Sequence, residues 1–257
     1  MRIDLNCDVG ESFGRYQLGD DQAVMAFATS VSVACGFHAG DPGTMRRTVD
    51  AAIAAGVAVG AHPGYPDLPG FGRREMALSP TEIADAVVYQ TGALAAFVRA
   101  AGGRLQHVKL HGALYNTAAR AAAVADAAVG AVARLERSLI IVGPPASQLQ
   151  AAAQRHGLGF AAEVFADRTY AADGQLTPRS DPGAFVPDAG EAARRVVRLL
   201  RTGTVETSAG TTLALRADTV CLHGDSPTAL AFARQIARAL DDAGIERRAF
   251  GPARAGA

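Results

Sequence analysis

The stretch Ile3-Asp4-Leu5-Asn6-Cys7-Asp8 has the pattern of a buried strand that ends on a carboxylate. A protein core disfavours such a group unless it is paired, so a carboxylate at a strand end indicates a functional position. Five later apolar runs also end on acidic residues, histidine or lysine, at residues 35–38, 60–63, 108–112, 163–168 and 221–225. The carboxyl ends of parallel strands lie together, so these six runs predict one active site.

Strand-like runs alternate with helical patterns along the whole chain. Strands are predicted at about residues 2–6, 31–35, 57–61, 106–110, 139–142, 158–164 and 219–222, and helices at 43–55, 79–101, 117–134, 146–156, 188–202 and 227–243. Two helix starts carry capping signals, Ser79 with Pro80 and Glu82, and Ser226 with Pro227. This alternation predicts an α/β fold with right-handed βαβ units.

Seven strands favour an irregular seven-stranded (β/α) barrel, and a doubly wound open sheet is the alternative. No linker or repeat interrupts the pattern, so we expect a single barrel domain over residues 1–250 and a disordered tail at 251–257.

Composition narrows the class of protein. The 257 residues carry a formal net charge of zero, which argues against a nucleic-acid surface. No run approaches the roughly 18 apolar residues of a membrane span. A strand pattern begins almost at once, so no signal peptide is expected. The three cysteines show no C-x-x-C spacing, which indicates buried thiols in a cytoplasmic protein; a nucleophilic Cys35 is the less favoured reading.

Histidines and carboxylates at successive strand ends indicate a metal site. Asp8, His38 and His62 could converge on a divalent ion with a position left for water, as in zinc, iron or manganese enzymes. His111 and His223 could replace either histidine. A hydrogen-bonded acid–base network without metal explains the same residues equally well.

Acid–base chemistry has its own candidates near the first strand. Asp4, Asp8 and Glu11 lie close together there, and like charges raise the pKa of at least one carboxyl group. We expect Asp8, more than Asp4, to contact the reacting groups.

Lys109 stands out because the 25 basic residues include no other lysine. A compact ammonium differs from a guanidinium fork, so its retention indicates a role that arginine does not fill. It could stabilise an oxyanion, hold a phosphoryl group or form a Schiff base, or it could pair with a carboxylate inside the barrel.

Two connections are too long and too rich in glycine and proline to be plain links, residues 62–74 and 167–187. Both follow strand ends, where a barrel carries its functional loops. Arg73 and Arg168 in these loops are candidate anion-binding residues. Neither a P-loop nor a G-x-G-x-x-G motif occurs, so a nucleotide would bind by another route or on a partner.

Seven ordered motifs resemble the LamB/YcsF family over nearly the whole chain. They are Asp-Leu-Asn-Cys-Asp-Val-Gly-Glu (4–11), Ala-Cys-Gly-Phe-His-Ala-Gly-Asp-Pro (34–42), Gly-Ala-His-Pro-Gly-Tyr-Pro-Asp (60–67), Gly-Phe-Gly-Arg-Arg (70–74), Val-Lys-Leu-His-Gly-Ala-Leu-Tyr-Asn (108–116), Glu-Val-Phe-Ala-Asp-Arg-Thr-Tyr (163–170) and Leu-His-Gly-Asp-Ser-Pro (222–227). One departure is Leu110, where the family usually has proline; its loss removes a restraint on the backbone at that strand end.

The resemblance implies one component, designated A, of an ATP-dependent 5-oxoprolinase, which cleaves 5-oxo-L-proline to L-glutamate together with subunits B and C. ATP is therefore an expected cofactor. Association of this chain with copies of itself, as a homo-oligomer, is one of the alternatives for its assembly. The resemblance also implies a barrel similar to that of polysaccharide deacetylases and glycoside hydrolases, in which strand-end Asp and His residues bind a divalent metal ion; Asp8, His38 and His62 take that place by analogy.

These motifs supply the expected site residues. Catalytic roles are expected for Asp8, Lys109, His111, Glu163, Asp167 and Arg168, and substrate-binding roles for Asn6, Glu11, Tyr65, Arg73, Tyr115, Asn116, His223 and Asp225.

Two other functions compete with this interpretation. A metal-dependent deacetylase or amide hydrolase would need bound metal and no ATP, but the chain has no Trp for a sugar platform. A lactam-binding protein without catalysis would tolerate Asp8→Asn with little loss of turnover, whereas a catalytic carboxylate would not.

Overall fold

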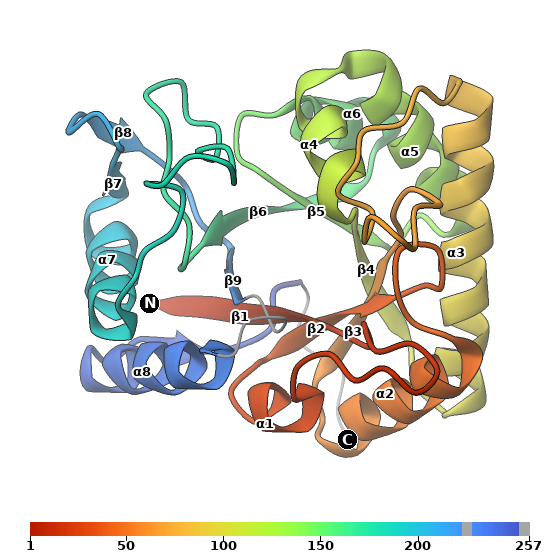
Figure 1. The fold of residues 1–257 in the computed structure, drawn as a ribbon, viewed down its shortest axis with the longest axis horizontal. Helices are drawn as coiled ribbons and strands as arrows, with labels where there is room; N and C mark the ends of the chain where they lie inside the picture. The colour runs from red at the N-terminus through yellow and green to blue at the C-terminus, as the bar shows by residue number, and fades with distance from the viewer. Residues whose placement is uncertain (223–227, 252–257) are drawn as a thin grey trace.

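A computed structural model describes residues 1–222 and 228–251. Seven parallel strands close a barrel, because the last of them pairs with both the sixth and the first (Figure 1). The strands in barrel order are β1 (Arg2–Val9), β2 (Ser30–Ala34), β3 (Ala58–His62), β4 (Leu105–Lys109), β5 (Ile140–Gly143), β6 (Gly159–Phe165) and β9 (Thr219–Leu222). The predicted seven-stranded barrel is confirmed, and the open-sheet alternative is wrong.

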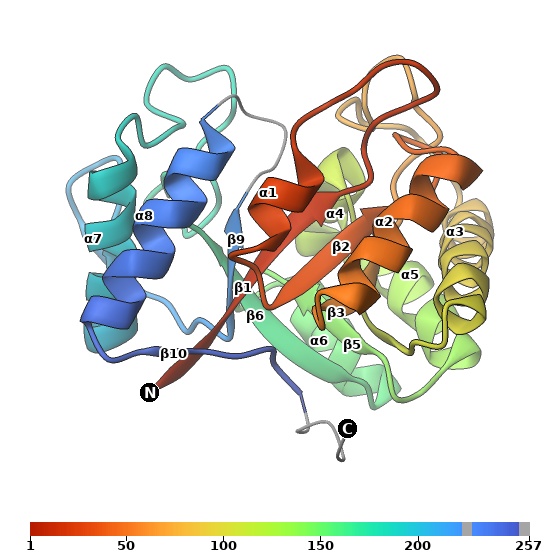
Figure 2. The same ribbon diagram turned by 90° about the horizontal axis from the view of Figure 1, so that it is seen from below.

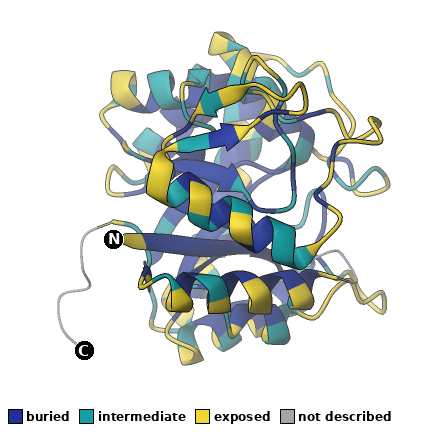
Figure 3. Cartoon of the chain, turned by 90° about the vertical axis from the view of Figure 1, so that its left-hand side faces the viewer, coloured by how far each residue is buried: buried dark blue, intermediate teal, exposed yellow. Residues whose placement is uncertain are grey.

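Helices surround the barrel and cover its strands. They are α1 (Asp21–Met25), α2 (Pro42–Ala54), α3 (Pro80–Ala100), α4 (Gly112–Arg120), α5 (Ala122–Leu135), α6 (Gln148–His156), α7 (Ala189–Thr202) and α8 (Ala229–Asp242). In Figure 1, α7 and α8 lie on the opposite side of the barrel from α3 and α5. Figure 3 shows helices that bury one side against the strands and expose the other.

Helix starts follow the local sequence closely. The predicted capping box at Ser79 is confirmed, since its side chain accepts from the amide of Glu82, and the Glu82 carboxylate accepts from the amide of Ser79. Asp41 caps α2 in the same way, with Pro42 in the first turn. The predicted cap of the last helix, Ser226 with Pro227, lies outside the described residues.

The two ends of the barrel differ in character. Long loops gather at the carboxyl end, whereas the amino terminus and the strand β10 (Glu246–Arg247) lie toward the opposite end (Figure 2). There β10 adds to β1, and Phe250 packs against His107 with 5.1 Å between ring centroids. The segment that precedes the tail thus covers the amino end, and residues 252–257, most of the expected tail, lie outside the described residues.

The structure has two helices where the sequence predicted one. The expected helix at 117–134 is split at Ala121, whose extended backbone separates α4 from α5. The run of alanines around this point contains no helix breaker, so the local pattern indicates continuity. Packing decides the break instead, because α4 buries Leu114 and Tyr115 toward the barrel while α5 packs against α3 and α6.

Short elements escaped the sequence prediction. They are α1, β10 and the antiparallel hairpin of β7 (Thr204–Glu206) and β8 (Thr212–Ala214). Each has five residues or fewer, too few to establish a helical or strand period.

Candidate active site

Polar side chains fill the inside of the barrel. Along β1 the residues Asp4, Asn6 and Asp8 alternate with apolar neighbours, so they share the inward face. Asp4 accepts hydrogen bonds from the hydroxyls of Ser30 and Thr219, and Asn6 donates to Glu163 at 3.1 Å. Barrel interiors are usually filled with branched apolar residues, so this polar column indicates a functional interior.

Lys109 is the centre of this column. Its Nζ lies 2.6 Å from Oδ1 of Asp8 and donates at 2.9 Å to both Asn6 Oδ1 and Glu163 Oε1 (all are buried). Burial favours the neutral amine and would lower the pKa of Lys109. The nearby charges, that of Asp8 first, outweigh it and hold this pKa well above its usual value.

The Lys109 contacts decide between its predicted roles. An ammonium has three N–H donors, and Lys109 donates to Asn6, Glu163 and the Sγ of Cys221 while its charge pairs with Asp8. Tyr115 completes the network by donating from its hydroxyl to the other oxygen of Glu163 at 2.7 Å. The geometry therefore favours the ion-paired interpretation of Lys109 over a Schiff base.

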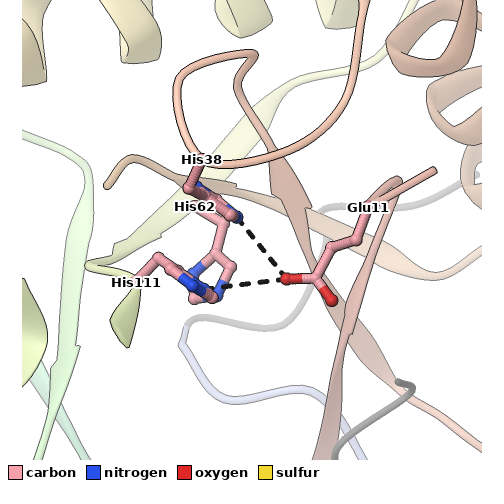
Figure 4. A group of neighbouring side chains, drawn as sticks. All are labelled: Glu11, His38, His62 and His111. Carbon is pink, nitrogen blue, oxygen red and sulfur yellow. Dashed lines mark hydrogen bonds and ion pairs between the residues drawn. The ribbon is translucent and has the colours of Figure 1, made fainter. Parts of the chain in front are cut away.

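Three histidines and a glutamate meet above the Lys109 network (Figure 4). They come from the ends of four consecutive strands: Glu11 after β1, His38 after β2, His62 at the end of β3 and His111 just after β4. One ligand atom from each lies within 4.8 Å of those of the others, and all four residues are buried. Such a group could hold a metal ion.

The hydrogen bonds of His62 and His111 fix their ring protons. His62 donates from Nδ1 to the Lys109 carbonyl at 2.7 Å, and His111 donates from Nε2 to the Phe71 carbonyl at 2.8 Å. A carbonyl only accepts, so each neutral ring keeps its lone pair on the other nitrogen. Those two nitrogens face each other at 3.0 Å.

Two facing lone pairs need a cation or a shared proton between them. Burial, followed by the charge of His62, lowers the pKa of His111 well below its usual value, which disfavours the proton. Backbone carbonyls that orient the far nitrogens are the usual second layer of histidine metal sites. The residues therefore fit a bound divalent cation.

His38 adds a third ring to this group. It is fully buried, stacks on His111 with 3.6 Å between centroids, and lies 3.5 Å from Oε1 of Glu11 through Nε2. Within the described part of the chain neither of its ring nitrogens makes a hydrogen bond. A buried ring without hydrogen bonds is costly, which is a second observation in favour of a ligand here.

The loop after β3 closes over the histidines. Its compact turn is held by Asp67, which pairs with Arg74 and accepts from the amide of Gly70 at 3.0 Å. The turn brings Gly72, at φ 61°, directly against His38 and His111, where a Cβ would overlap the Cβ of His38 and the ring of His111. Glycine at this position is therefore a packing requirement of the cluster.

A cavity of about 240 Å³ opens at the carboxyl end of the barrel. Asp8, Glu11, His62 and His111 form part of its lining. The remaining lining includes Lys109, Leu110, Tyr115, Asn116, Glu163, Phe165, Leu176, Arg73, Arg168 and Arg179. A ligand in this cavity thus meets both acid–base groups and guanidinium groups.

The structure brings most of the predicted site residues to this cavity. Asp8, Glu11, His62, Arg73, Lys109, His111, Tyr115, Asn116, Glu163 and Arg168 line it, and His38 and Asn6 contact residues that do. Tyr65 lies elsewhere, in the hydrophobic core, and Asp167 begins the 167–187 loop without lining the cavity. His223 and Asp225 lie outside the described residues.

The structure groups the metal candidates differently from the sequence prediction. Asp8 lies 3.4 Å from Nε2 of His62, but its other oxygen is held by Lys109. Glu11, expected to bind substrate, and His111, expected to act in catalysis, complete the cluster with His38 and His62 instead. The sequence offered His111 as an alternative ligand but not Glu11, because only the closed barrel shows which strand ends face each other.

Arg179 is a cavity residue that sequence reasoning missed. It follows Thr177-Pro178 within the long loop and has no motif around it.

The cysteines match the favoured prediction of buried thiols. All three are free and buried, and burial raises the pKa of Cys35 to about 12.

The comparisons with known proteins agree with this geometry. The model described as "LamB/YcsF family" matches residues 3–255. The chain belongs to the LamB/YcsF family. A solved relative, titled a lactam utilization protein from Thermus thermophilus, is 48% identical with a TM-score of 0.93, over 97% of this chain and 100% of that one. A putative cellobiose-phosphate cleavage protein from Enterococcus faecalis, at 12% identity and a TM-score of 0.55, shares the fold alone.

Curated relatives of the family extend over the same length. A protein from Brevibacillus brevis, named as the A component of 5-oxoprolinase, is 55% identical over 95% of this chain and 96% of its own. One of the same name from Bordetella pertussis is 56% identical over the same shares. Among the described helices, none is both long and apolar enough to cross a membrane.

Proposed function

We propose that this chain is the A component of an ATP-dependent 5-oxoprolinase and that it carries the site where the lactam ring of 5-oxo-L-proline is opened to L-glutamate. The relatives so named, at 55% and 56% identity over 95% of the chain, support the activity. The observation that carries the assignment to this site is the cavity, which is lined by Asp8, by three members of the Glu11–His38–His62–His111 cluster and by three arginines.

Ring opening adds one water molecule across the amide bond. The oxygen of water joins the carbonyl carbon, the C–N bond breaks, and one proton of the water ends on the released amine. Asp8 lines the cavity and is held by Lys109, so it can take that proton as water attacks and return it to nitrogen as the ring opens. The ammonium of Lys109 lies 2.6 Å from Oδ1 of Asp8 and holds the carboxylate in place for that role.

The other polar residues have positioning roles in this scheme. Glu163 and Asn6 fix Lys109, and Tyr115 fixes Glu163, so the orientation of Asp8 depends on the whole network. The arginines in the lining of the cavity favour a substrate with a negative charge.

A divalent metal ion fits the cluster of Glu11, His38, His62 and His111. When bound, such an ion supplies Lewis acidity toward the lactam oxygen or an acidified water molecule. Two observations support this part of the proposal. The ring nitrogens of His62 and His111 that carry lone pairs face each other, and the buried ring of His38 makes no hydrogen bond to a described residue.

ATP and the partner subunits belong to the same proposal. Neither a P-loop nor a G-x-G-x-x-G motif is present in this chain, so we assign use of ATP to the partner subunits B and C. Their cleavage of ATP makes an otherwise unfavourable ring opening proceed. Three free cysteines favour a reducing cytoplasm as the place of action.

Reconstitution tests the proposed function. The purified chain is incubated with 5-oxoproline and ATP, alone and with its cognate B and C subunits, while glutamate and ADP are followed together. Equal amounts of glutamate and ADP in the complete mixture only are expected. ATP hydrolysis that depends on 5-oxoproline with this chain alone would contradict the assignment of ATP to the partners. Absence of glutamate from the complete mixture would contradict the activity itself.

A further inference from the structure

Helix α3 carries an amide side chain where a core helix usually carries an apolar one. Gln90 is fully buried in the middle of α3, and on the same face Val87 and Leu94 are buried apolar residues. A buried amide is costly unless its polar atoms make hydrogen bonds. A glutamine at this position therefore indicates a specific partner.

The partner of Gln90 is the backbone of Gly64, in the loop after β3. Oε1 of Gln90 accepts from the Gly64 amide at 3.0 Å, and Nε2 donates to the Gly64 carbonyl at 2.8 Å and to the Ala86 carbonyl at 3.0 Å. The side chain thus pairs with both polar groups of Gly64, as a neighbouring strand would. Two hydrogen bonds therefore hold the start of the loop to α3.

Gly64 lies against the histidine cluster on its other side. The place that a Cβ would take at Gly64 is 2.8 Å from Nδ1 of His38 and 3.3 Å from the Cβ atoms of His38 and His111. The preceding Pro63 accepts from the amide of His111 at 2.8 Å. The backbone that α3 holds thus contacts two of the three histidines and directly follows the third, His62.

This packing decides which nitrogen of His38 faces the cluster. Because Gly64 covers Nδ1, the nitrogen directed at Glu11 is Nε2, at 3.5 Å. A metal ligand has to be held within about 0.5 Å of its productive place. A shift of Gly64 would release the ring of His38 from that place.

A second contact from α3 reaches the segment that carries His38. Tyr89 stacks on Phe37 with 5.3 Å between ring centroids, and Phe37 directly precedes His38. Two successive residues of α3, Tyr89 and Gln90, therefore hold the two segments that bring His38 and His62 to the cluster.

We propose that Gln90 is a positioning residue of the metal cluster, which acts through Gly64 on His38 and His111. This inference rests on the metal site of the proposed function and extends it to a helix outside the barrel. Residues that orient metal ligands without touching the ion typically change metal affinity about 10–100-fold when they are removed. Gln90 acts one peptide group further out, so the low end of that range applies.

Cobalt(II) binding by the full chain tests this role. The chain is freed of metal with a chelator and titrated with cobalt(II), whose visible spectrum reports the geometry of its ligands. Gln90→Met keeps the length of the side chain and removes its hydrogen bonds. Cobalt affinity should fall about tenfold or more, with an altered spectrum, because His38 and His111 lose their fixed places.

Leu94→Ala is the matched control for stability. Helix α3 runs from the carboxyl end of β3 back to the amino end of β4, so Leu94 lies one turn further from the cluster than Gln90. Truncation of this buried side chain leaves a cavity, and the variant should unfold at lower urea concentration than the wild type. Its cobalt affinity should nevertheless stay within about twofold of the wild type, as expected for distant sites.

Gly64→Ala tests the contact between the loop and the cluster independently. The added methyl group would meet Nδ1 of His38, so cobalt affinity should fall about tenfold or more here too. This variant supplies the answer if Gln90→Met does not fold.

Three results would each overturn the inference. They are wild-type cobalt affinity and spectrum in Gln90→Met, equal losses of affinity in Gln90→Met and Leu94→Ala, and wild-type affinity in Gly64→Ala. A wild-type chain that binds no cobalt(II) would overturn it together with the metal site.

The same proteins distinguish this inference from the proposed function. Glutamate formation by the reconstituted wild-type complex, with unchanged cobalt binding by Gln90→Met, rejects the role of Gln90 and keeps the function. Weakened cobalt binding by Gln90→Met, without any glutamate from the wild-type complex, keeps the role of Gln90 in a metal site and rejects the function.

Discussion

Lys109 shows how a single side chain orders a buried site. Its ammonium lies among Asp8, Asn6 and Glu163 inside the barrel, so one positive charge compensates two carboxylates. The sequence indicated its importance through the absence of any other lysine, but not its partners, which come from strands up to 112 residues away.

Removal of Lys109 should destabilise the fold as well as the site. Lys109→Met leaves the buried carboxylates of Asp8 and Glu163 without their cation, which should cost about 3–5 kcal/mol of unfolding free energy. Urea denaturation measures it. Glu163→Gln combined with Lys109→Met should recover part of the loss, and strictly additive effects would show that the pair is not coupled.

Asp4 should make stability depend on pH. Burial raises its pKa from 3.8 to about 6, despite hydrogen bonds from Thr219, Thr29 and Ser30. Ionisation is therefore harder in the folded than in the unfolded state, so this group's contribution to stability falls as pH rises from about 4 to about 6.

Asp4→Asn should remove that dependence. Between pH 4 and pH 7 the unfolding free energy of the variant should rise relative to the wild type by roughly 3 kcal/mol, from a shift of about two pKa units. Chemical denaturation at several pH values measures the difference, and a difference that stays constant with pH would contradict the pKa assigned to Asp4.

The histidine cluster predicts retained metal. The chain purified without chelators should contain a divalent metal ion, and His62→Ala should lose it, because the site then lacks one of its four ligands. His156→Ala is the control, since His156 ends α6 and pairs with Asp126 outside the cluster. Elemental analysis decides the matter, and metal content that is unchanged in His62→Ala would contradict this site.

At the scale of elements, the strands and most helices follow from the sequence. Strand-like runs predicted all seven barrel strands, and the capping signal at Ser79 predicted the start of α3. The break at Ala121 could not be predicted, because packing of α4 and α5 on different neighbours imposes it on a run of good helix formers. The site was predictable as a set of strand ends, but the grouping of Glu11 with three histidines depends on the barrel's closure.

Gly60 shows a constraint between elements. It lies on β3 at an irregularity in its pairing with β4, and a Cβ there would overlap the imidazole of His107 inside the barrel. Gly60→Ala should therefore destabilise the protein by about 1–3 kcal/mol through overpacking.

Gly92→Ala is the matched control for that substitution. Gly92 lies within α3 with open space around its Cβ position, so alanine should stabilise the helix by about 0.5–1 kcal/mol. Thermal denaturation compares the two variants. Equal effects at both positions would show that His107 does not occupy the space beside Gly60.

At the scale of the whole molecule, the barrel separates stability from chemistry. The segment before the tail covers the amino end, where β10 pairs with β1 and Gln106 donates to the Phe250 carbonyl at 2.8 Å. The histidine cluster and the cavity lie at the other end of the strands. The long loops gather at that end too (Figure 2). Substitutions at the amino end should thus affect folding before they affect turnover.

The central claim is that this chain opens the lactam ring rather than only binding the lactam. The decisive measurement is glutamate formation by the complex reconstituted with Asp8→Asn, together with 5-oxoproline binding by the variant chain. Asp50→Asn on the exposed face of α2 is the control. We predict that Asp8→Asn lowers the rate of glutamate formation about a hundredfold or more while 5-oxoproline still binds, and that Asp50→Asn changes neither. Glutamate formation by Asp8→Asn at close to the wild-type rate would contradict the account and leave the chain as a lactam-binding protein.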